Sequence, residues 1–229
     1  MGLGQWEKAE TLLVRARETA AAEGDGATEL SVCSELLGFY RMWGRREPFE
    51  TVYERTAELL RQVDPGPVSR GTILINAATA LVAFGRTAEA MPLYRQAQEC
   101  YRRAVPAGDF RIAALCNNMA SAHQTMGEYA LAEELIQKAV AVLKGLAHHP
   151  DVATSYVNLA QLYAAQDTAD PRIGECLDAA MAALDDPEAV WDGYYAHTAR
   201  KCAGGFAALG RGEQARELEE RAALIYEGT

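Results

Sequence analysis

Apolar residues recur every three or four positions along almost the whole chain, and Gly, Pro and Asp interrupt this pattern at intervals. That spacing is typical of helices with one buried face. Ala is frequent and runs of Val, Ile and Thr are scarce, which also favours helices over strands. We therefore predict an all-α chain of eleven helices, at about 5–23, 27–43, 46–63, 66–84, 87–104, 109–126, 129–145, 151–165, 171–184, 187–209 and 212–226.

Some of these helix starts carry a specific signal. Asp64, Asp170 and Asp186 each precede a proline. An aspartate side chain accepts hydrogen bonds from the first free N–H groups of a helix, and proline suits the first helical turn. The pattern therefore predicts that the tenth helix begins near residue 187.

A set of small residues returns every 40–42 residues. Each clear copy has a Gly, an Ala five residues later and an Ala twelve residues after the Gly, and these copies begin at Gly4, Gly85, Gly127 and Gly210. A weaker copy begins at Gly44, where Phe49 and Thr56 take the places of Ala. Near Thr168 the sequence Asp167-Thr-Ala-Asp-Pro-Arg replaces the glycine. The chain is therefore predicted to consist of copies of one structural unit.

Each copy has a physical explanation as a pair of helices. A Gly ends a helix in the left-handed conformation at no steric cost. Two Ala residues seven apart lie on one face of the next helix, where their small side chains let a neighbouring helix approach closely. The helix before the Gly has its own motif, which reads Asn76-Ala-Ala-x-x-Leu81, Asn118-Met-Ala-x-x-His123 and Asn158-Leu-Ala-x-x-Tyr163.

These motifs resemble the tetratricopeptide repeat (TPR) family, whose second helix carries the pattern seen at Ala90-x-x-x-Tyr94-x-x-Ala97. The Asn-Leu-Ala-x-x-Tyr motif with a period near 42 resembles the kinesin-light-chain-like subgroup. The resemblance implies an α-solenoid, a right-handed superhelix of about five and a half helix pairs. It implies a single array over residues 1–229, with a half repeat at 1–24 and repeats at about 27–64, 66–105, 109–146, 150–184 and 187–229.

The first helix of this array is the second member of a pair whose first member is absent from the sequence. Leu3, Trp6 and Leu13 are therefore expected to form an apolar strip without a cover inside the chain. Exposed apolar strips mark interaction sites. We expect either a homodimer through this N-terminal helix or a fold-back of residues 1–3 over the strip.

The net negative charge of the chain disfavours some classes of binding partner. Lys and Arg total 22, Asp and Glu total 32, and the net charge is −10. This balance disfavours nucleic acid and anionic membrane surfaces, which attract basic proteins. The sequence has no apolar run long enough to span a membrane and no signal-peptide pattern. Five separated Cys without a Cys-x-x-Cys pair indicate free thiols in a reducing compartment, so we expect a cytoplasmic protein.

No pattern of catalytic or metal-binding residues is found. His123 takes the position that Tyr163 holds in the next repeat, so it is expected to be buried or half-buried between paired helices. Cys116 and Cys202 lie on inward helix faces and are expected to serve packing. Gly204-Gly205 lies inside a predicted helix and does not form a phosphate-binding loop. We therefore predict a protein that is not an enzyme, with no cofactor and no metal.

In the TPR family the first helices of the pairs line the concave face. The residues that the resemblance places in that groove are Glu35, Asn76, Asn117, Asn118, Ser121, Asn158, Gln161, His197, Arg200 and Lys201. An Asn amide both donates and accepts hydrogen bonds, so a row of them can hold the backbone of an extended peptide. The alternative is that each Asn bonds a neighbouring helix or water, and the sequence does not decide between the two.

The leading hypothesis is a non-enzymatic scaffold that holds an extended peptide or protein segment in this groove. Two alternatives remain: a structural self-association module, and the sensor portion of a larger bacterial regulator. The row runs from Glu35 to Lys201, so a bound segment is expected to be basic at one end and acidic at the other. Asn158 and Lys201 match the carboxylate clamp of chaperone-binding TPR proteins, but His197, Asn117 and Ser121 depart from it.

Overall fold

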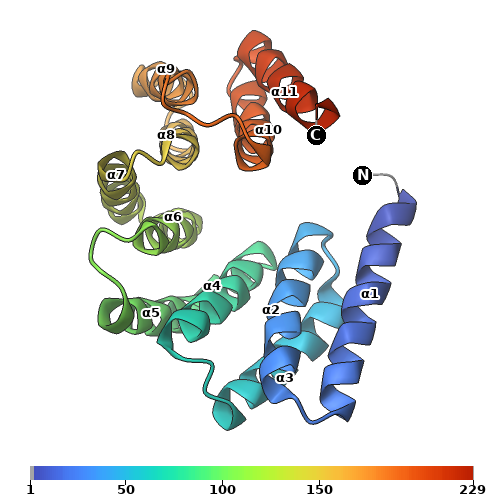
Figure 1. Ribbon diagram of the computed structural model, residues 1–229. Coiled ribbons are helices and arrows are strands. Elements are labelled where there is room, and N and C mark those ends of the chain that lie inside the picture. The colour runs from blue at the N-terminus through green and yellow to red at the C-terminus, as the bar shows by residue number, and fades with distance from the viewer. Residues whose placement is uncertain (1–2, 229) are drawn as a thin grey trace. The chain divides into compact units, whose positions relative to one another are not determined.

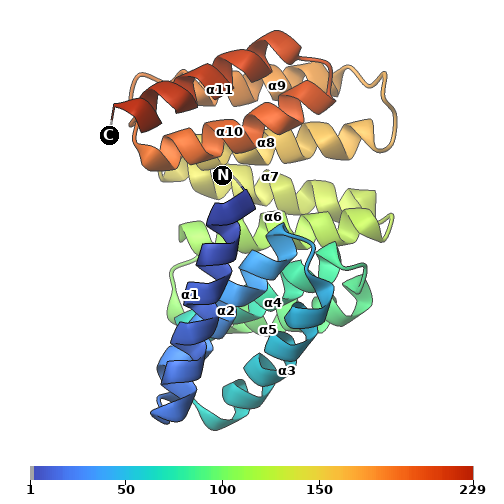
Figure 2. The same cartoon turned by 90° about the vertical axis from the view of Figure 1, so that its right-hand side faces the viewer.

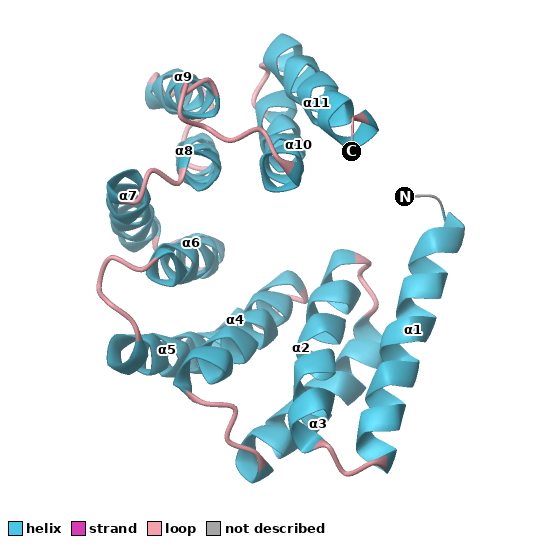
Figure 3. Cartoon of the chain, viewed as in Figure 1, coloured by secondary structure: helices cyan, strands magenta, loops and turns pink. Residues whose placement is uncertain are grey.

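The structure is a computed structural model that describes residues 3–228, with side chains from Trp6 onward, and this part of the chain contains helices and loops alone (Figure 3). The helices are α1 (Leu3–Ala22), α2 (Gly26–Met42), α3 (Arg46–Gln62), α4 (Pro67–Ala83), α5 (Thr87–Ala104), α6 (Phe110–Thr125), α7 (Tyr129–Gly145), α8 (His149–Ala164), α9 (Arg172–Leu184), α10 (Gly193–Ala208) and α11 (Gly212–Glu227). The prediction of eleven helices is confirmed for the described residues.

The start of the tenth helix was predicted wrongly. Helix α10 begins at Gly193, because the carboxylate of Asp192 accepts the N–H groups of Tyr194 and Tyr195, each at 2.9 Å. Asp186 instead accepts the N–H of Glu188 at 2.9 Å and stabilises a turn. The two large apolar side chains between these aspartates stay largely at the surface, since Val190 is 70% exposed and Trp191 is 51% exposed, so this stretch does not bury a helix face.

The chain divides along the sequence, between Pro106 and Ala107, into two compact units, here called unit 1 (α1 to α5) and unit 2 (α6 to α11). In unit 1, α2 contacts α1, α3 and α4, and α4 forms a hairpin with α5 (Figure 1). In unit 2, three hairpins follow one another, and α8 contacts α6, α7, α9 and α10 (Figure 2). Both units are therefore stacks of helical hairpins.

Small residues stand where the repeat pattern placed them. Ala90 and Ala97 in α5 are fully buried, and so are Ala132 and Ala139 in α7. The predicted turn glycines Gly44, Gly85, Gly127 and Gly210 all have positive φ angles, between 63° and 81°. As inferred from the sequence, the alanines therefore let two helices approach closely, and the glycines end helices.

The α2–α3 hairpin replaces both small residues with larger ones. Phe49 and Thr56 are buried, with exposed fractions of 0% and 2%. The Phe49 ring packs 4.7 Å from that of Phe84, and the Thr56 hydroxyl donates to the Val52 carbonyl at 2.7 Å. In this hairpin an aromatic side chain that packs on Phe84, at the end of α4, fills the position where α5 and α7 have a small residue.

The same hairpin contains a buried ion pair that links its two helices. Glu29 on α2 is 3% exposed, and Arg55 on α3 donates to both of its carboxylate oxygens at 2.7 Å. Arg55 also donates to Glu58 at 2.8 Å. Because a bidentate guanidinium satisfies the carboxylate almost completely, the charge of Glu29 can be buried.

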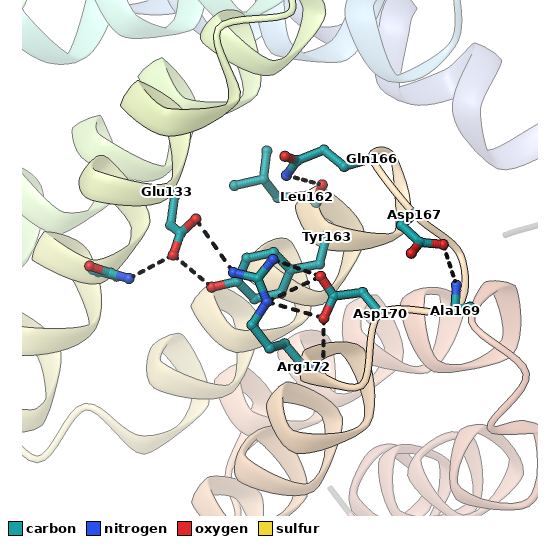
Figure 4. Close-up of polar contacts among 9 residues, drawn as sticks. Glu133, Leu162, Tyr163, Gln166, Asp167, Ala169, Asp170 and Arg172 are labelled. Atoms are coloured by element: carbon teal, nitrogen blue, oxygen red, sulfur yellow. Dashed lines mark hydrogen bonds and ion pairs between the residues drawn. The ribbon is translucent and has the colours of Figure 1, made fainter.

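The turn between α8 and α9 closes without a glycine. Asp167 accepts the N–H of Ala169 at 2.9 Å, and Asp170 accepts the N–H of Arg172 at 2.9 Å (Figure 4). No residue of this turn is among the described residues with positive φ. Two carboxylates therefore bind the N–H groups of a tight turn and replace the left-handed glycine of the other repeats.

Side chains around this turn connect three helices. The Arg172 guanidinium lies 3.9 Å from the ring centre of Tyr163, and the Tyr163 hydroxyl donates to Glu133 on α7 at 2.9 Å (Figure 4). Burial and this hydrogen bond raise the pKa of Tyr163 to about 12. Arg172 also holds Asp170 at 2.6 Å, and this hydrogen bond lowers the pKa of the Asp170 carboxyl.

The apolar strip expected on α1 is partly covered within the chain. Trp6 is covered in part, because its ring stacks on Trp43 of α2 with centres 5.6 Å apart and the Arg45 guanidinium lies 5.4 Å from it. Leu13 is half-buried, whereas Leu12 is 67% exposed. The side chain of Leu3 and residues 1–2 lie outside the described part. Self-association through this helix stays a prediction.

Candidate functional site

A pocket of about 150 Å³ lies between α8 and α10 of unit 2. Its lining residues are Thr154, Val157, Asn158, Gln161, Lys201 and Cys202. Asn158, Gln161 and Lys201 were predicted from the sequence to line the groove. The four α8 residues follow helical spacing, so one face of that helix forms a wall of the pocket.

Close packing of α10 on α8 shapes the floor of this pocket. A Cβ atom at Gly205 would overlap the side chain of Val157 and lie 3.3 Å from Nε2 of Gln161. Cys202 is 1% exposed, and burial raises the pKa of its thiol to about 11. The thiol therefore stays protonated near neutral pH and is not an activated nucleophile. The polar groups of the pocket are the two amides, the Lys201 ammonium and the Thr154 hydroxyl, which donates to the Pro150 carbonyl at 3.2 Å.

Asn117 and Asn158 form a hydrogen-bonded ladder between α6 and α8. The Asn158 amide donates to the Asn117 carbonyl oxygen at 3.3 Å, and the Asn117 amide donates to the Ser155 hydroxyl at 2.8 Å. Both functional groups of Asn117 are thus used within the chain. The Asn158 carbonyl oxygen and second amide hydrogen have no hydrogen-bond partner among the described residues, so this side chain retains hydrogen-bonding capacity.

The remaining predicted groove residues on α6 and in unit 1 have other arrangements. Asn118 donates to the Ala114 carbonyl of its own helix at 2.9 Å, and Ser121 is exposed. Asn76 on α4 donates to the Ser34 hydroxyl on α2 at 2.9 Å, whereas Glu35 on α2 is exposed. The Asn row therefore serves helix-to-helix bonding in part, which is the alternative that the sequence left open.

Helix α10 presents three polar side chains to solvent. His197, Arg200 and Lys201 are all exposed. Arg200 pairs with Glu219 of α11 at 3.5 Å, so part of its charge is neutralised. Lys201 alone among these three lines the α8–α10 pocket.

Sequence reasoning missed Thr154, Val157 and Cys202 as lining residues. Thr154 and Val157 precede Asn158 and Gln161 by about one helical turn, so the spacing on α8 could have indicated them. The position of Cys202 depends on how α10 packs on α8, which no local pattern reveals.

The candidate reactive groups elsewhere behave as packing residues. Burial raises the pKa of Cys33 and Cys176 to about 11, and it raises the pKa of Cys116 as well. The side chain of His123 is 13% exposed and contacts Glu128 at 2.6 Å, which confirms its predicted half-buried position. Among the described residues, no helix is both long and apolar enough to cross a membrane.

Family models described as tetratricopeptide repeat match residues 70–109 and residues 111–170. A search of curated proteins finds no match to the sequence. BtubC (BKLC) from P. vanneervenii is a similar solved structure, with 19% identity, a TM-score of 0.62, and coverage of 98% of this chain and 90% of that one. The family models thus match the central helices, and the similar structure matches almost the whole chain.

A second similar structure is a putative kinesin light chain from Podosopora anserina with nearly identical TPR-like repeats. It has 22% identity and a TM-score of 0.59, and the match covers 87% of this chain and 96% of that one. At these identities the structures establish the fold, while the sequence matches establish the repeat type. Residues 70–109 and 111–170 are therefore tetratricopeptide repeats, and the all-α fold of the chain is similar to the folds of BtubC (BKLC) and of that putative kinesin light chain.

Proposed function

We propose that this chain is a non-enzymatic scaffold that binds an extended peptide or protein segment along the first helices of its repeats. Tetratricopeptide repeats are in general protein-interaction modules. The observation that carries the finer proposal is the α8–α10 pocket, in which Asn158, Gln161 and Lys201 converge beside an apolar floor. The proposal includes a single repeat array over residues 1–229, with the predicted groove residues of each unit as binding residues.

The chemistry of the pocket favours a segment that offers hydrogen-bond acceptors. Asn158 and Gln161 can pair with backbone groups of any sequence, each bond contributing about 0.5–1.5 kcal/mol net. Lys201 attracts an acidic side chain or a C-terminal carboxylate at close range. Residues 150–199 contain nine acidic residues and one basic residue, which opposes an anionic ligand over longer distances. Such a site binds with modest affinity, and its specificity comes mainly from the negative charge that the ligand places next to Lys201.

A peptide-library selection on the purified chain tests this proposal. Selected peptides should carry an acidic group, and Lys201→Glu should weaken their binding about tenfold or more, since one charge-assisted contact contributes about 1.5–3 kcal/mol. Gln161→Ala should weaken it less, because a neutral contact is lost. Lys138→Glu on α7 makes the same charge change at an exposed position outside the pocket. That control should leave binding unchanged.

Two results would contradict the proposal. If the selected peptides bind Lys201→Glu as tightly as the wild type, the α8–α10 pocket is not the binding surface. If no peptide is selected and the sedimentation mass rises with concentration, the self-association module becomes the better account. In that case Trp6→Glu or Leu12→Glu on α1 should return the chain to a monomer.

A further inference from the structure

A histidine and two carboxylates from distant parts of the sequence converge at one end of α8. They are His149, the first residue of that helix, and Asp186 and Glu188 in the loop between α9 and α10. One ligand atom from each side chain lies within 4.8 Å of the other two. We propose that these three side chains form a binding site for Zn²⁺ or a similar borderline divalent cation.

The distance between the first two groups fits a shared metal better than a direct hydrogen bond. Nδ1 of His149 and Oδ2 of Asp186 are 3.6 Å apart, beyond the usual hydrogen-bond limit of about 3.2 Å. Two atoms that bind one tetrahedral Zn²⁺ at about 2.0–2.2 Å lie roughly 3.3–3.6 Å from each other. Glu188 is exposed, so its side chain can rotate to complete the set.

The local structure holds Asp186 ready for this function. Its Oδ1 accepts the N–H of Glu188 at 2.9 Å, and its backbone carbonyl accepts the N–H of Ala189 at 2.9 Å. Oδ2 is thereby directed toward His149. Ligands that are fixed by hydrogen bonds to their own loop bind a metal with less loss of side-chain entropy.

His149 itself has an unusual environment. Its side chain is 17% exposed, and Nε2 is buried with no hydrogen-bond partner among the described residues. Buried polar atoms of proteins are nearly always hydrogen-bonded. Neither ring nitrogen of His149 therefore has a close protein partner, so the lone pair of Nδ1 can bind a cation while Nε2 carries the ring proton.

The choice of metal follows from the ligands and the surroundings. An imidazole with two carboxylates suits Zn²⁺ or Co²⁺, whereas Mg²⁺ and Ca²⁺ prefer sites made of oxygen alone. The excess of acidic residues in this part of the chain also attracts cations. A pocket of about 300 Å³ lined in part by His149, Asp186 and Lys144 adjoins the site, so the fourth coordination position is open to water.

The sequence alone showed no metal pattern, because His149 and Asp186 are brought together only by the packing of the α9–α10 loop against α8. The proposed site lies at the start of α8, separate from the peptide pocket farther along that helix. It does not depend on the proposed peptide binding.

Titration of the chelator-treated full chain with Zn²⁺ in a calorimeter, and with Co²⁺ in a visible-absorption assay, tests the proposal. We expect one Zn²⁺ per chain and the intense visible bands of tetrahedral Co²⁺. Each of the variants His149→Gln, Asp186→Asn and Glu188→Gln should weaken Zn²⁺ binding by at least about tenfold. Loss of a residue that only supports a metal ligand already weakens binding about 10–100-fold, and loss of a ligand should weaken it at least as much. Glu188→Gln changes an exposed side chain and should leave the helix content of the chain unchanged.

Matched controls separate this site from other histidines and thiols. His123→Gln removes a histidine that also contacts a carboxylate, and His148→Gln removes the adjacent histidine, which contacts Asp151 at 3.3 Å. Cys100→Ser removes a partly exposed thiol. All three should bind Zn²⁺ like the wild type. The proposal is overturned if the wild type binds no Zn²⁺, or if binding survives Glu188→Gln and Asp186→Asn, or if it is lost in a control variant.

Discussion

The α2–α3 hairpin of unit 1 and the α8–α9 hairpin of unit 2 both depart from the repeat motif, in different ways. The first keeps the glycine turn at Gly44 but places Phe49 and Thr56 where the motif has Ala. The second keeps a small residue, Ala180, fully buried but closes its turn with two aspartates.

The two hairpins show what a residue must do when it replaces a residue of the motif. A buried position needs its volume filled and its polar atoms bonded, as the Phe49 ring and the Thr56 hydroxyl do. A turn position needs its N–H groups bonded, as the Asp167 and Asp170 carboxylates do. The first substitution creates a large buried contact, and the second stays at the surface. The two hairpins should therefore respond very differently to mutation.

The largest effect is expected when the motif residue is restored in the α2–α3 hairpin. Phe49→Ala should destabilise the protein by about 3–5 kcal/mol, because it leaves a cavity beside Phe84 and Tyr53. Phe110→Ala, at a side chain that is 43% exposed, is the control and should cost less than about 1 kcal/mol. Urea unfolding followed by circular dichroism measures both. Equal losses would mean that Phe49 does not fill a packed interface.

Arg55 in the first hairpin and Arg172 in the second allow a direct test of this difference. Arg55→Ala leaves the buried Glu29 carboxylate without a partner and should cost about 3 kcal/mol, the low end of the range for a broken buried pair because Arg55 is 34% exposed. Arg172→Ala removes contacts at the surface and should change the unfolding midpoint far less.

A double variant identifies the cause of the Arg55 effect. Glu29→Gln combined with Arg55→Ala should recover part of the lost stability, because no charge then remains buried. If Arg172→Ala is as costly as Arg55→Ala, burial does not distinguish the two hairpins.

The smallest effect concerns pH and the aspartate turn. Arg172 lowers the pKa of Asp170 in the folded chain, mainly through a side-chain hydrogen bond. The folded pKa lies below the unfolded value of about 4, so the contribution to stability is present above pH 4 and is lost as the pH falls through the folded pKa. A carbon-detected NMR titration of Asp170 should show this lowered pKa, and Arg172→Ala should move it back upward. An unchanged pKa in that variant would remove Arg172 as the cause.

Much of the fold could be read from local patterns. The helical spacing, the glycine turns and the buried alanines depend on residues within one or two turns of each other, so the sequence contains them directly. Ala132 is fully buried and His123 is half-buried, as their positions in the repeat indicated. The start of α10 was missed because two aspartates compete as caps within seven residues, and burial of the following side chains decides between them.

The sequence by itself determined the repeat, the helix pairs and the inward faces of this protein, because these follow from backbone preference and periodicity. Only the tertiary structure decided which polar side chains meet. Asn158 bonds Asn117 across 41 residues, Glu29 binds Arg55 across 26, and His149 faces Asp186 across 37. Such pairs depend on the relative rotation and shift of two packed helices or of a loop on a helix. A small change in that packing separates two polar atoms by more than the roughly 3 Å of a hydrogen bond. No local sequence pattern specifies the rotation and shift of the packed elements.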